Sequence, residues 1–236
     1  MRSRAVKNHI ERPFVFMNMA ITADGKIASR NGSVSSFGSP RDQDHLYELR
    51  AQADAVLCGA RTVEKEGATL GPGGIKFQRR RLQNGLAEFS LRVLVSGSGS
   101  INPNSDLFKA RFSPIIILAS GRISSTRLRK LSRVADEVKI IGKSEIDFRA
   151  AFAWLRQKWK VKALLCEGGG TVNDALFRAD LIDQIHLTIC PKIFGGRRAP
   201  TIADGPGFDH LNLAKHFQLD SATRINSELF TVLSRR

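Results

Sequence analysis

The chain has 236 residues, of which 42% are hydrophobic and 25% charged, as in a globular protein with one large domain or two small ones. No apolar run approaches the roughly 20 residues of a membrane span, so we expect no membrane partner. The formal net charge of +15 attracts anions, such as nucleic acid or a phosphorylated cofactor and substrate. Because zinc-finger, RNA-recognition and basic-zipper patterns are missing, we expect a small phosphorylated ligand and no nucleic acid.

The first residues, 1–11, are predicted to form a basic tail, and without a visible linker residues 12–236 are expected to form a single domain. Short runs rich in Val, Ile and Leu predict strands that are buried on both faces of a sheet. These runs cover residues 13–21, 53–59, 91–97, 113–120, 137–142 and 161–169. Amphipathic patterns predict helices between them, at 42–53, 124–134 and 147–159.

The last third of the chain changes character, because three predicted strands follow one another without helices. They cover 182–194, 216–225 and 227–234, with a tight turn at Asn226 and Ser227. We therefore expect an α/β fold with a mixed sheet, parallel in its centre and antiparallel in its C-terminal strands. Residues 67–90, rich in Gly, Arg and Gln, predict a surface loop with mobile parts.

The three cysteines, Cys58, Cys166 and Cys190, each lie in a strongly apolar run and lack CxxC spacing. This pattern predicts small buried side chains in strands, and it argues against disulfides or a zinc site. It also favours a reducing, cytoplasmic compartment. The five histidines show no ligand spacing, so we expect no metal.

Three consecutive glycines, Gly168, Gly169 and Gly170, separate an apolar strand from a helix that begins near Thr171. A helix N-terminus exposes unpaired N–H groups and a positive dipole end, and glycines let this backbone approach a bulky anion. The G-x-G-x-x-G and GK[ST] fingerprints are missing, so a dinucleotide pyrophosphate is inferred from the expected geometry alone. The alternative is a structural turn that needs a positive φ.

A second junction of the same kind follows another predicted strand, where Gly59 precedes Arg61 and Thr62. Two such junctions on neighbouring parallel strands would hold one pyrophosphate from both sides. Ser96 and Arg122 follow the next two strands, where a hydroxyl and a guanidinium suit the adenosine side of NADPH with its 2′-phosphate.

Three motifs occur in a specific order: TADGKI at 22–27, EGGGT at 167–171 and PKIFGGRRAPT at 191–201. With them the chain resembles the C-terminal reductase domain of the riboflavin-biosynthesis deaminase/reductase family, without the deaminase half. The resemblance implies a three-layer dihydrofolate reductase-like fold and a homodimer. It also implies NADPH-dependent reduction of a 5-phosphoribosylamino-pyrimidine to its ribitylamino product. Alternatives are a reductase of the same fold for another heterocycle, such as a pterin, or a non-catalytic protein that binds nucleotides or nucleic acid.

The resemblance also implies roles for single residues. Both glycine turns match the family's cofactor contacts, and the Thr22 and Ala23 backbone is expected to face the nicotinamide. Ser39 and Arg50 are expected to bind substrate, Arg50 through the phosphate. Asp24 is interpreted as a structural turn residue.

Glu167 follows a buried run, so its carboxyl is expected to be partly desolvated. We interpret it as the group that protonates or orients the opening sugar; the alternative is an anchor for the glycine turn. Glu66 stands where the family has an acid. The surrounding segment 64–73 lacks the family's proline and arginine, so Arg79–Arg81 are a hypothetical substitute for the missing charge.

Asn18 in the first strand is expected to contact the pyrimidine, at a position where the resemblance implies Lys in bifunctional bacterial enzymes and Asn in archaeal ones. Lys only donates hydrogen bonds, whereas Asn both donates and accepts. We therefore predict that a diaminopyrimidinone substrate is used at least as well as a diaminouracil.

Overall fold

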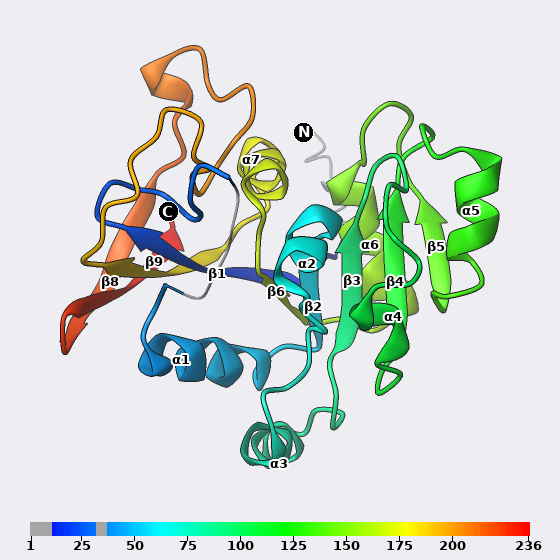
Figure 1. Ribbon diagram of the computed structural model, residues 1–236, viewed down its shortest axis with the longest axis horizontal. Coiled ribbons are helices and arrows are strands. Elements are labelled where there is room, and N and C mark those ends of the chain that lie inside the picture. Colours follow the sequence, from blue (N-terminus) through cyan, green and yellow to red (C-terminus); the bar gives the residue numbers. More distant parts are fainter. Residues whose placement is uncertain (1–10, 32–36) are drawn as a thin grey trace, which may run out of the picture.

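The computed structural model describes residues 11–31 and 37–236, so nearly all of the predicted basic tail lies outside the described residues. Within this part of the chain one nine-stranded sheet has the order β5-β4-β3-β2-β6-β1-β7-β9-β8 (Figure 1). The strands are β1 Phe14–Thr22, β2 Ala55–Gly59, β3 Leu91–Val95, β4 Ile115–Ala119, β5 Glu137–Ile140, β6 Ala163–Cys166, β7 Gln184–Cys190, β8 Phe217–Ile225 and β9 Glu228–Arg235. The helices are α1 Pro40–Arg50, α2 Ala60–Glu66, α3 Ile75–Gln83, α4 Asp106–Lys109, α5 Ser125–Leu131, α6 Phe148–Lys158 and α7 Gly170–Arg178, with a 3₁₀ turn at Leu211–Leu213.

The pairing of the strands confirms the predicted mixed sheet. Seven strands from β5 to β7 are parallel, and β9 and β8 continue the sheet antiparallel. Each parallel pair is linked through helices because a parallel crossover needs a long connection, whereas β8 and β9 are joined by the predicted tight turn at Asn226 and Ser227.

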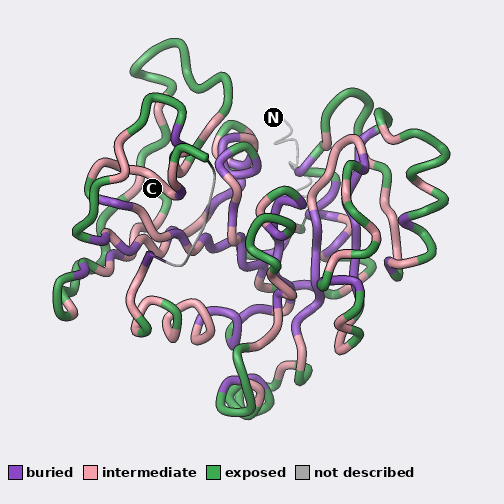
Figure 2. The backbone as a smooth tube through the Cα atoms, in the orientation of Figure 1, coloured by how far each residue is buried: buried purple, intermediate pink, exposed green. Residues whose placement is uncertain are grey.

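Two hydrophobic clusters cover the two faces of the sheet. Alternate residues of β1 divide between them: Val15 and Met17 join the cluster formed with α6 and α7, and Phe16 joins the cluster formed with α1, α4 and α5. Accordingly α7 and α1 lie on opposite sides of β1 (Figure 1). Every residue of β2 and β4 is buried, which explains why their sequences are continuously apolar (Figure 2).

The helix starts follow local capping rules. Ser39 accepts a hydrogen bond from the Asp42 N–H at 3.3 Å and is followed by Pro40 at the first helical position. Asp147 caps α6 in the same way through the Ala150 N–H at 3.1 Å. These caps place the observed starts of α1 and α6 within two residues of the predicted ones.

The prediction of a surface loop at 67–90 is wrong, because α3 lies within it and buries Phe77 and Arg81. Arg81 is only 1% exposed. Its guanidinium donates to the carbonyls of Arg50 and Ala53, both at 2.6 Å, and of Ala87 at 2.8 Å. A positive charge at this place suits the C-terminal end of α1, where carbonyls are left unpaired. Arg81 is therefore unavailable for the phosphate role suggested for the arginine cluster.

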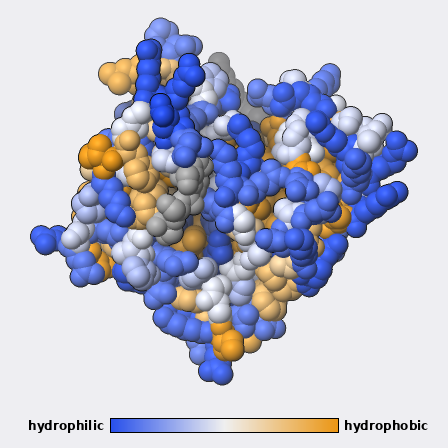
Figure 3. All heavy atoms as spheres, in the orientation of Figure 1, coloured by the Kyte–Doolittle hydropathy of each residue, from blue (hydrophilic) through white to orange (hydrophobic). Residues whose placement is uncertain are grey.

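The described part of the chain contains no helix with the length and apolar character that crossing a membrane requires. In the space-filling view, hydrophilic side chains cover most of the visible face and hydrophobic ones form small separate patches (Figure 3).

Replacing Arg81 by Met is expected to lower the free energy of unfolding by about 3 kcal/mol, because three carbonyls at the end of α1 and beyond α3 lose their donor. Urea denaturation of the purified variant measures this. Arg80→Met, on the exposed side of the same helix, is the control and should change the free energy by less than about 0.5 kcal/mol. Equal effects of the two changes would refute a structural role for Arg81.

Candidate active site

A cavity of about 1160 Å³ opens where the carboxyl ends of the central strands meet. Its lining includes Asn18 on β1, Gly59 and Val95 at the ends of β2 and β3, and Glu167 directly after β6. Parallel strands bring these ends to one edge of the sheet, which is the usual place for ligands in open α/β folds.

The two glycine turns are joined in the structure. Gly168 and Gly169 have φ values of 78° and 91°, a region that residues with a Cβ rarely adopt. The N–H of Gly59 donates to the Gly168 carbonyl at 3.0 Å, so the end of β2 and the turn after β6 are held together. The start of α7 has no side-chain cap, and the N–H groups of Val172 and Asn173 donate to the Gly169 carbonyl at 2.8 and 3.0 Å.

The side chains beside these turns suit a diphosphate. Arg61 Nη2 lies 3.2 Å from Thr171 Oγ1, which links the N-termini of α2 and α7. A Cβ added to Gly169 would stand 2.7 Å from Thr62 Oγ1, so glycine is needed for this close approach. Glycine turns, two helix starts and a guanidinium on one cavity wall fit the pyrophosphate of a dinucleotide.

Ser96 and Arg122 line the same cavity, although they follow different strands. Arg122 reaches the turn that follows Ser96, because a Cβ added to Gly97 would lie 3.1 Å from Arg122 Nη2. A guanidinium and hydroxyls at this end of the cavity suit a phosphorylated adenosine.

Four predicted contact residues, Thr22, Ala23, Ser39 and Gly168, do not line the cavity. Thr22 is fully buried and donates to Asp24 Oδ1 at 2.5 Å. Ser39 donates to Glu228 Oε2 at 2.5 Å and caps α1. Ligand contact by these four residues stays a prediction, and the structure gives them roles in the scaffold.

Asp24 is the turn residue that the sequence indicated. Its carboxylate accepts hydrogen bonds from the Phe194 and Gly195 N–H groups at 3.2 and 2.7 Å. These bonds tie the TADGKI segment to the PKIFGG segment, and Ile27 of the first segment lines the cavity.

Arg50 and Glu167, distant in sequence, form a buried ion pair. Arg50 Nε lies 2.5 Å from Glu167 Oε1 and Nη2 lies 2.6 Å from Oε2, while Nη1 donates to the Gly71 carbonyl at 2.5 Å. Burial disfavours the charged guanidinium, but the charge and hydrogen bonds of Glu167 outweigh it, so the pKa of Arg50 is raised. The guanidinium expected to bind phosphate is thus directed to Glu167, and its phosphate role stays a prediction.

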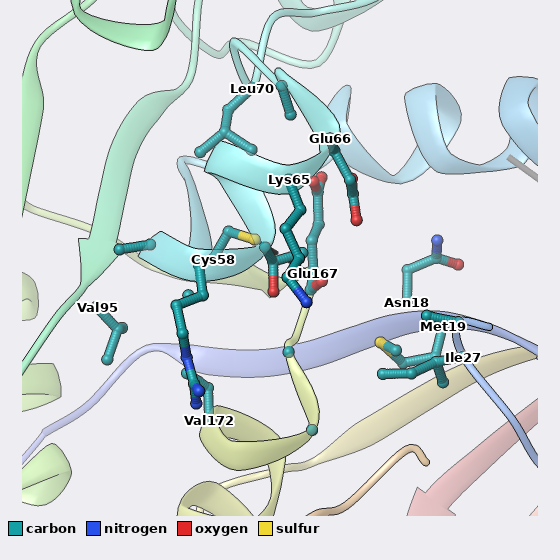
Figure 4. A pocket seen from close by; sticks show the side chains of 18 of the residues that line it. Asn18, Met19, Ile27, Cys58, Lys65, Glu66, Leu70, Val95, Glu167 and Val172 are labelled. Carbon is teal, nitrogen blue, oxygen red and sulfur yellow. Dashed lines mark hydrogen bonds between the residues drawn. The ribbon is translucent and has the colours of Figure 1, made fainter. Parts of the chain in front are cut away.

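Glu66, at the end of α2, lies over the same cavity as Glu167 (Figure 4). Although the residue as a whole is exposed, desolvation of its carboxyl raises the pKa to about 7. The negative charge of Glu167 adds to this shift and the positive charge of Arg50 opposes it. One carboxylate of the pair is therefore ion-paired, and the other is half-protonated near neutral pH.

Sequence analysis missed several residues that line the cavity, among them Asp42, Tyr47 and Lys65. Tyr47 stands three residues before Arg50 on α1, and its ring centre lies 5.5 Å from the guanidinium carbon. Lys65, on α2, lines the same cavity as Glu167 (Figure 4). Helical spacing from Arg50 and from Thr62 would have found Tyr47 and Lys65. The described residues contain no group of His, Cys, Asp or Glu able to hold a metal.

The fold defines an α/β protein of the dihydrofolate reductase-like class, with its cavity at the carboxyl ends of the central strands. Dihydrofolate reductase from Enterococcus faecalis superposes with a TM-score of 0.51 at 14% identity, over 94% of this chain and 96% of that one. A pyrimidine reductase-like protein from Corynebacterium diphtheriae has a TM-score of 0.82 at 23% identity, over 95% and 92% of the two chains. Residues 13–229 match the RibD C-terminal domain, and the chain belongs to this family.

Relatives in sequence span nearly the whole chain. The 2,5-diamino-6-ribosylamino-4(3H)-pyrimidinone 5′-phosphate reductase of Archaeoglobus fulgidus is 29% identical, over 95% of this chain and 98% of that protein. The reductase of the same name from Aquifex aeolicus is 26% identical, over 94% and 96%. These comparisons confirm the family and the fold that the three motifs indicated, and family and fold together imply a nicotinamide cofactor.

Proposed function

We propose that the protein is a reductase of riboflavin biosynthesis that converts 2,5-diamino-6-ribosylamino-4(3H)-pyrimidinone 5′-phosphate to its ribitylamino product with NADPH. One observation carries this proposal: the Glu66 and Glu167 carboxyls lie where the glycine turns meet the Arg50 end of α1, in one cavity. The names of the full-length relatives supply the substrate. We assign this activity to residues 12–236 as one domain.

The cavity walls fit NADPH in two places. The turns at Gly59 and at Gly169 and Gly170, with Arg61, Thr62 and Thr171, would hold the pyrophosphate, and Ser96 and Arg122 would hold the 2′-phosphate. When bound, NADPH supplies the hydride that the nitrogen-linked carbon of the ribose accepts.

The two carboxyls divide the remaining work. Opening of the ribose breaks the bond between its nitrogen-linked carbon and the ring oxygen, and this oxygen takes up a proton. Glu66 holds a proton near neutral pH and donates it, because its pKa is about 7. Glu167, held in place by Arg50, orients the sugar. Its negative charge favours the positive charge that develops at the nitrogen-linked carbon of the ribose. The sequence hypothesis is that Glu167 protonates or orients the sugar; the ion pair with Arg50 favours the orienting role and leaves the proton to Glu66.

Asn18 supports the choice of a diaminopyrimidinone. Its side chain rises from β1 beside the cavity (Figure 4), and its buried Oδ1 has no hydrogen-bond partner within the described residues. An unpaired acceptor favours a ligand edge that donates hydrogen bonds. A pterin remains the alternative substrate, to be compared in the same assay.

The homodimer is part of the proposal. β8 forms one edge of the sheet, and its side chains are exposed along nearly the whole strand, including Leu219 at 56%. A long exposed edge strand is a template for pairing with another chain. We also propose a cytoplasmic location, because the three cysteines are buried free thiols.

Replacing Glu66 by Gln is expected to lower kcat by roughly 100-fold. It should also remove the decline of kcat above pH 7, because the variant has no proton donor that titrates there. Wild-type kcat should fall as pH rises through about 7, since a group with a raised pKa loses its proton there. Steady-state NADPH oxidation with the diaminopyrimidinone substrate, followed as a function of pH, measures kcat and its pH dependence for both proteins. Glu64→Gln, which removes an exposed acid of the same helix outside this cavity, should behave as wild type. An unchanged alkaline decline in Glu66→Gln would contradict the assignment.

Replacing Arg122 by Ala is expected to weaken NADPH binding about tenfold and NADH binding hardly at all, because only NADPH carries the 2′-phosphate. Fluorescence titration with the two cofactors gives the two Kd values. Arg129→Ala, an exposed arginine on α5 outside the cavity, serves as the matched control. Equal weakening of both cofactors would place the 2′-phosphate elsewhere.

Sedimentation equilibrium is expected to give twice the chain mass of 26.0 kDa. Replacing Leu219 by Lys should shift the equilibrium toward monomer, because it puts a charge on the exposed edge strand. Leu82 on α3 has the similar exposure of 57%, so Leu82→Lys is the matched control. A monomeric wild type would refute the dimer.

A further inference from the structure

The 66–73 segment, which leads from the end of α2 toward α3, forms one wall of the cavity. Every residue of this segment except Pro72 lines the cavity, and the chain passes the end of α1 on its way to α3 (Figure 1). Residues 69–73 form no hydrogen bond between backbone groups within the described part of the chain. Side chains must therefore hold the segment in place, and its first residue is Glu66, the proposed proton donor.

Side-chain contacts hold the segment along its length. Leu70 is buried in the hydrophobic core, although its φ of 57° is rare for a residue with a Cβ. The Gly71 carbonyl accepts a hydrogen bond from Arg50 Nη1 at 2.5 Å. Gly73, with a φ of 84°, lies directly against Tyr47, because an added Cβ would overlap Cγ and Cδ1 of the ring. The end of α1 thus supports the segment through Arg50 and Tyr47.

The ring of Tyr47 is enclosed by other parts of the protein. The guanidinium carbon of Arg50 lies 5.5 Å from the ring centre, and the ring centre of Phe77 on α3 lies at 5.3 Å. The Tyr47 hydroxyl accepts a hydrogen bond from Gln43 Nε2 at 3.2 Å. These contacts occupy the ring and its hydroxyl, so holding its neighbours fits Tyr47 better than touching a reacting group.

We propose that Tyr47 is a positioning residue, which holds the 66–73 segment against α1 and so keeps the Glu66 carboxyl in its desolvated place at the cavity. This rests on the proposed function and adds the side chain on which the setting of its proton donor depends. Without the ring, Gly73 loses the surface on which it lies. The segment then moves away from α1, and water reaches the Glu66 carboxyl.

Access of water changes the pH at which Glu66 gives up its proton. Desolvation is the first cause that raises its pKa to about 7, so solvation returns this pKa toward that of an ordinary glutamate. Glu167 after β6 raises the pKa of Glu66, and Arg50 on α1 lowers it. The Cys58 thiol on β2 and the Lys65 ammonium on α2 line the same cavity. All four groups are kept in the variants below, so a lower pKa of Glu66 reports access of water.

Replacing Tyr47 by Ala is expected to move the alkaline decline of kcat from about pH 7 to a pH about one unit lower. Tyr47→Phe keeps the ring that supports Gly73 and should restore the wild-type profile. Steady-state NADPH oxidation as a function of pH measures both variants. A wild-type profile in Tyr47→Ala, or an equal shift in Tyr47→Phe, would overturn the proposal.

Replacing Gly73 by Ala tests the same contact from the other side, and it leaves Tyr47 in the protein. The added Cβ forces the ring and the segment apart, so the decline of kcat should shift in the same direction. Gly85→Ala is the matched control, because Gly85 has a similar φ of 71°, has no neighbour within 4 Å and does not line the cavity. Equal shifts in the two glycine variants would assign the effect to backbone strain and refute the role of Tyr47.

NMR of the protein without substrate separates this proposal from the proposed reaction. Glutamate is labelled with ¹³C at the side-chain carboxyl, and Glu66→Gln identifies the signal of Glu66. This signal should titrate near pH 7 in the wild type and about one unit lower in Tyr47→Ala. Equal titrations would overturn the role of Tyr47. The expected shift in a protein that reduces no pyrimidine substrate would support the role of Tyr47 and refute the proposed reaction.

Discussion

The buried ion pair between Arg50 and Glu167 is the contact on which the arrangement of the cavity depends. It joins the last residue of α1 to the residue that follows β6, and the same guanidinium holds the carbonyl of Gly71. Removing one partner of such a pair costs about 3–5 kcal/mol, because the other charge is left buried without compensation. The pair therefore fixes helix, sheet and the 66–73 segment relative to one another.

The ion pair also determines where protons reside. Arg50 satisfies one carboxylate, and the negative charge so fixed makes it harder for Glu66 to ionise. Two similar side chains thus acquire different states at neutral pH from their surroundings alone. The glycine turns complete the site from the other side, since the hydrogen bond between Gly59 and Gly168 places two helix starts next to the carboxyl pair. Charge for the phosphates and a proton for the sugar are supplied by separate parts of one cavity.

Much of the fold was predictable, because the buried strands and the amphipathic helices each have a distinct hydrophobic period. The glycine turns were predictable as well, since Gly168 and Gly169 adopt a backbone conformation that few other residues accept. Helix α3 was not: its arginines indicated solvent, and Arg81 is buried only because it meets carbonyls from the end of α1. Those acceptors are backbone atoms, which leave no mark in the sequence.

The same reasoning explains what sequence analysis of the site could not show. Arg50 and Glu167 were both recognised as site residues, but their pairing spans 117 positions and follows no local spacing. Asp42 has the sequence position of an ordinary residue of the first helical turn, and only the packing of α1 on the sheet shows that it lines the cavity.

The hydrogen bond from Arg50 to the Gly71 carbonyl anchors the 66–73 segment through its main chain. A carbonyl is present whatever amino acid occupies the position, so the anchor does not depend on the side chain at position 71. A side chain added at position 71 would make only ordinary contacts, with Thr69 and Phe112. Position 71 is thus a place where enzyme engineers can vary the lining of the cleft while leaving its framework intact.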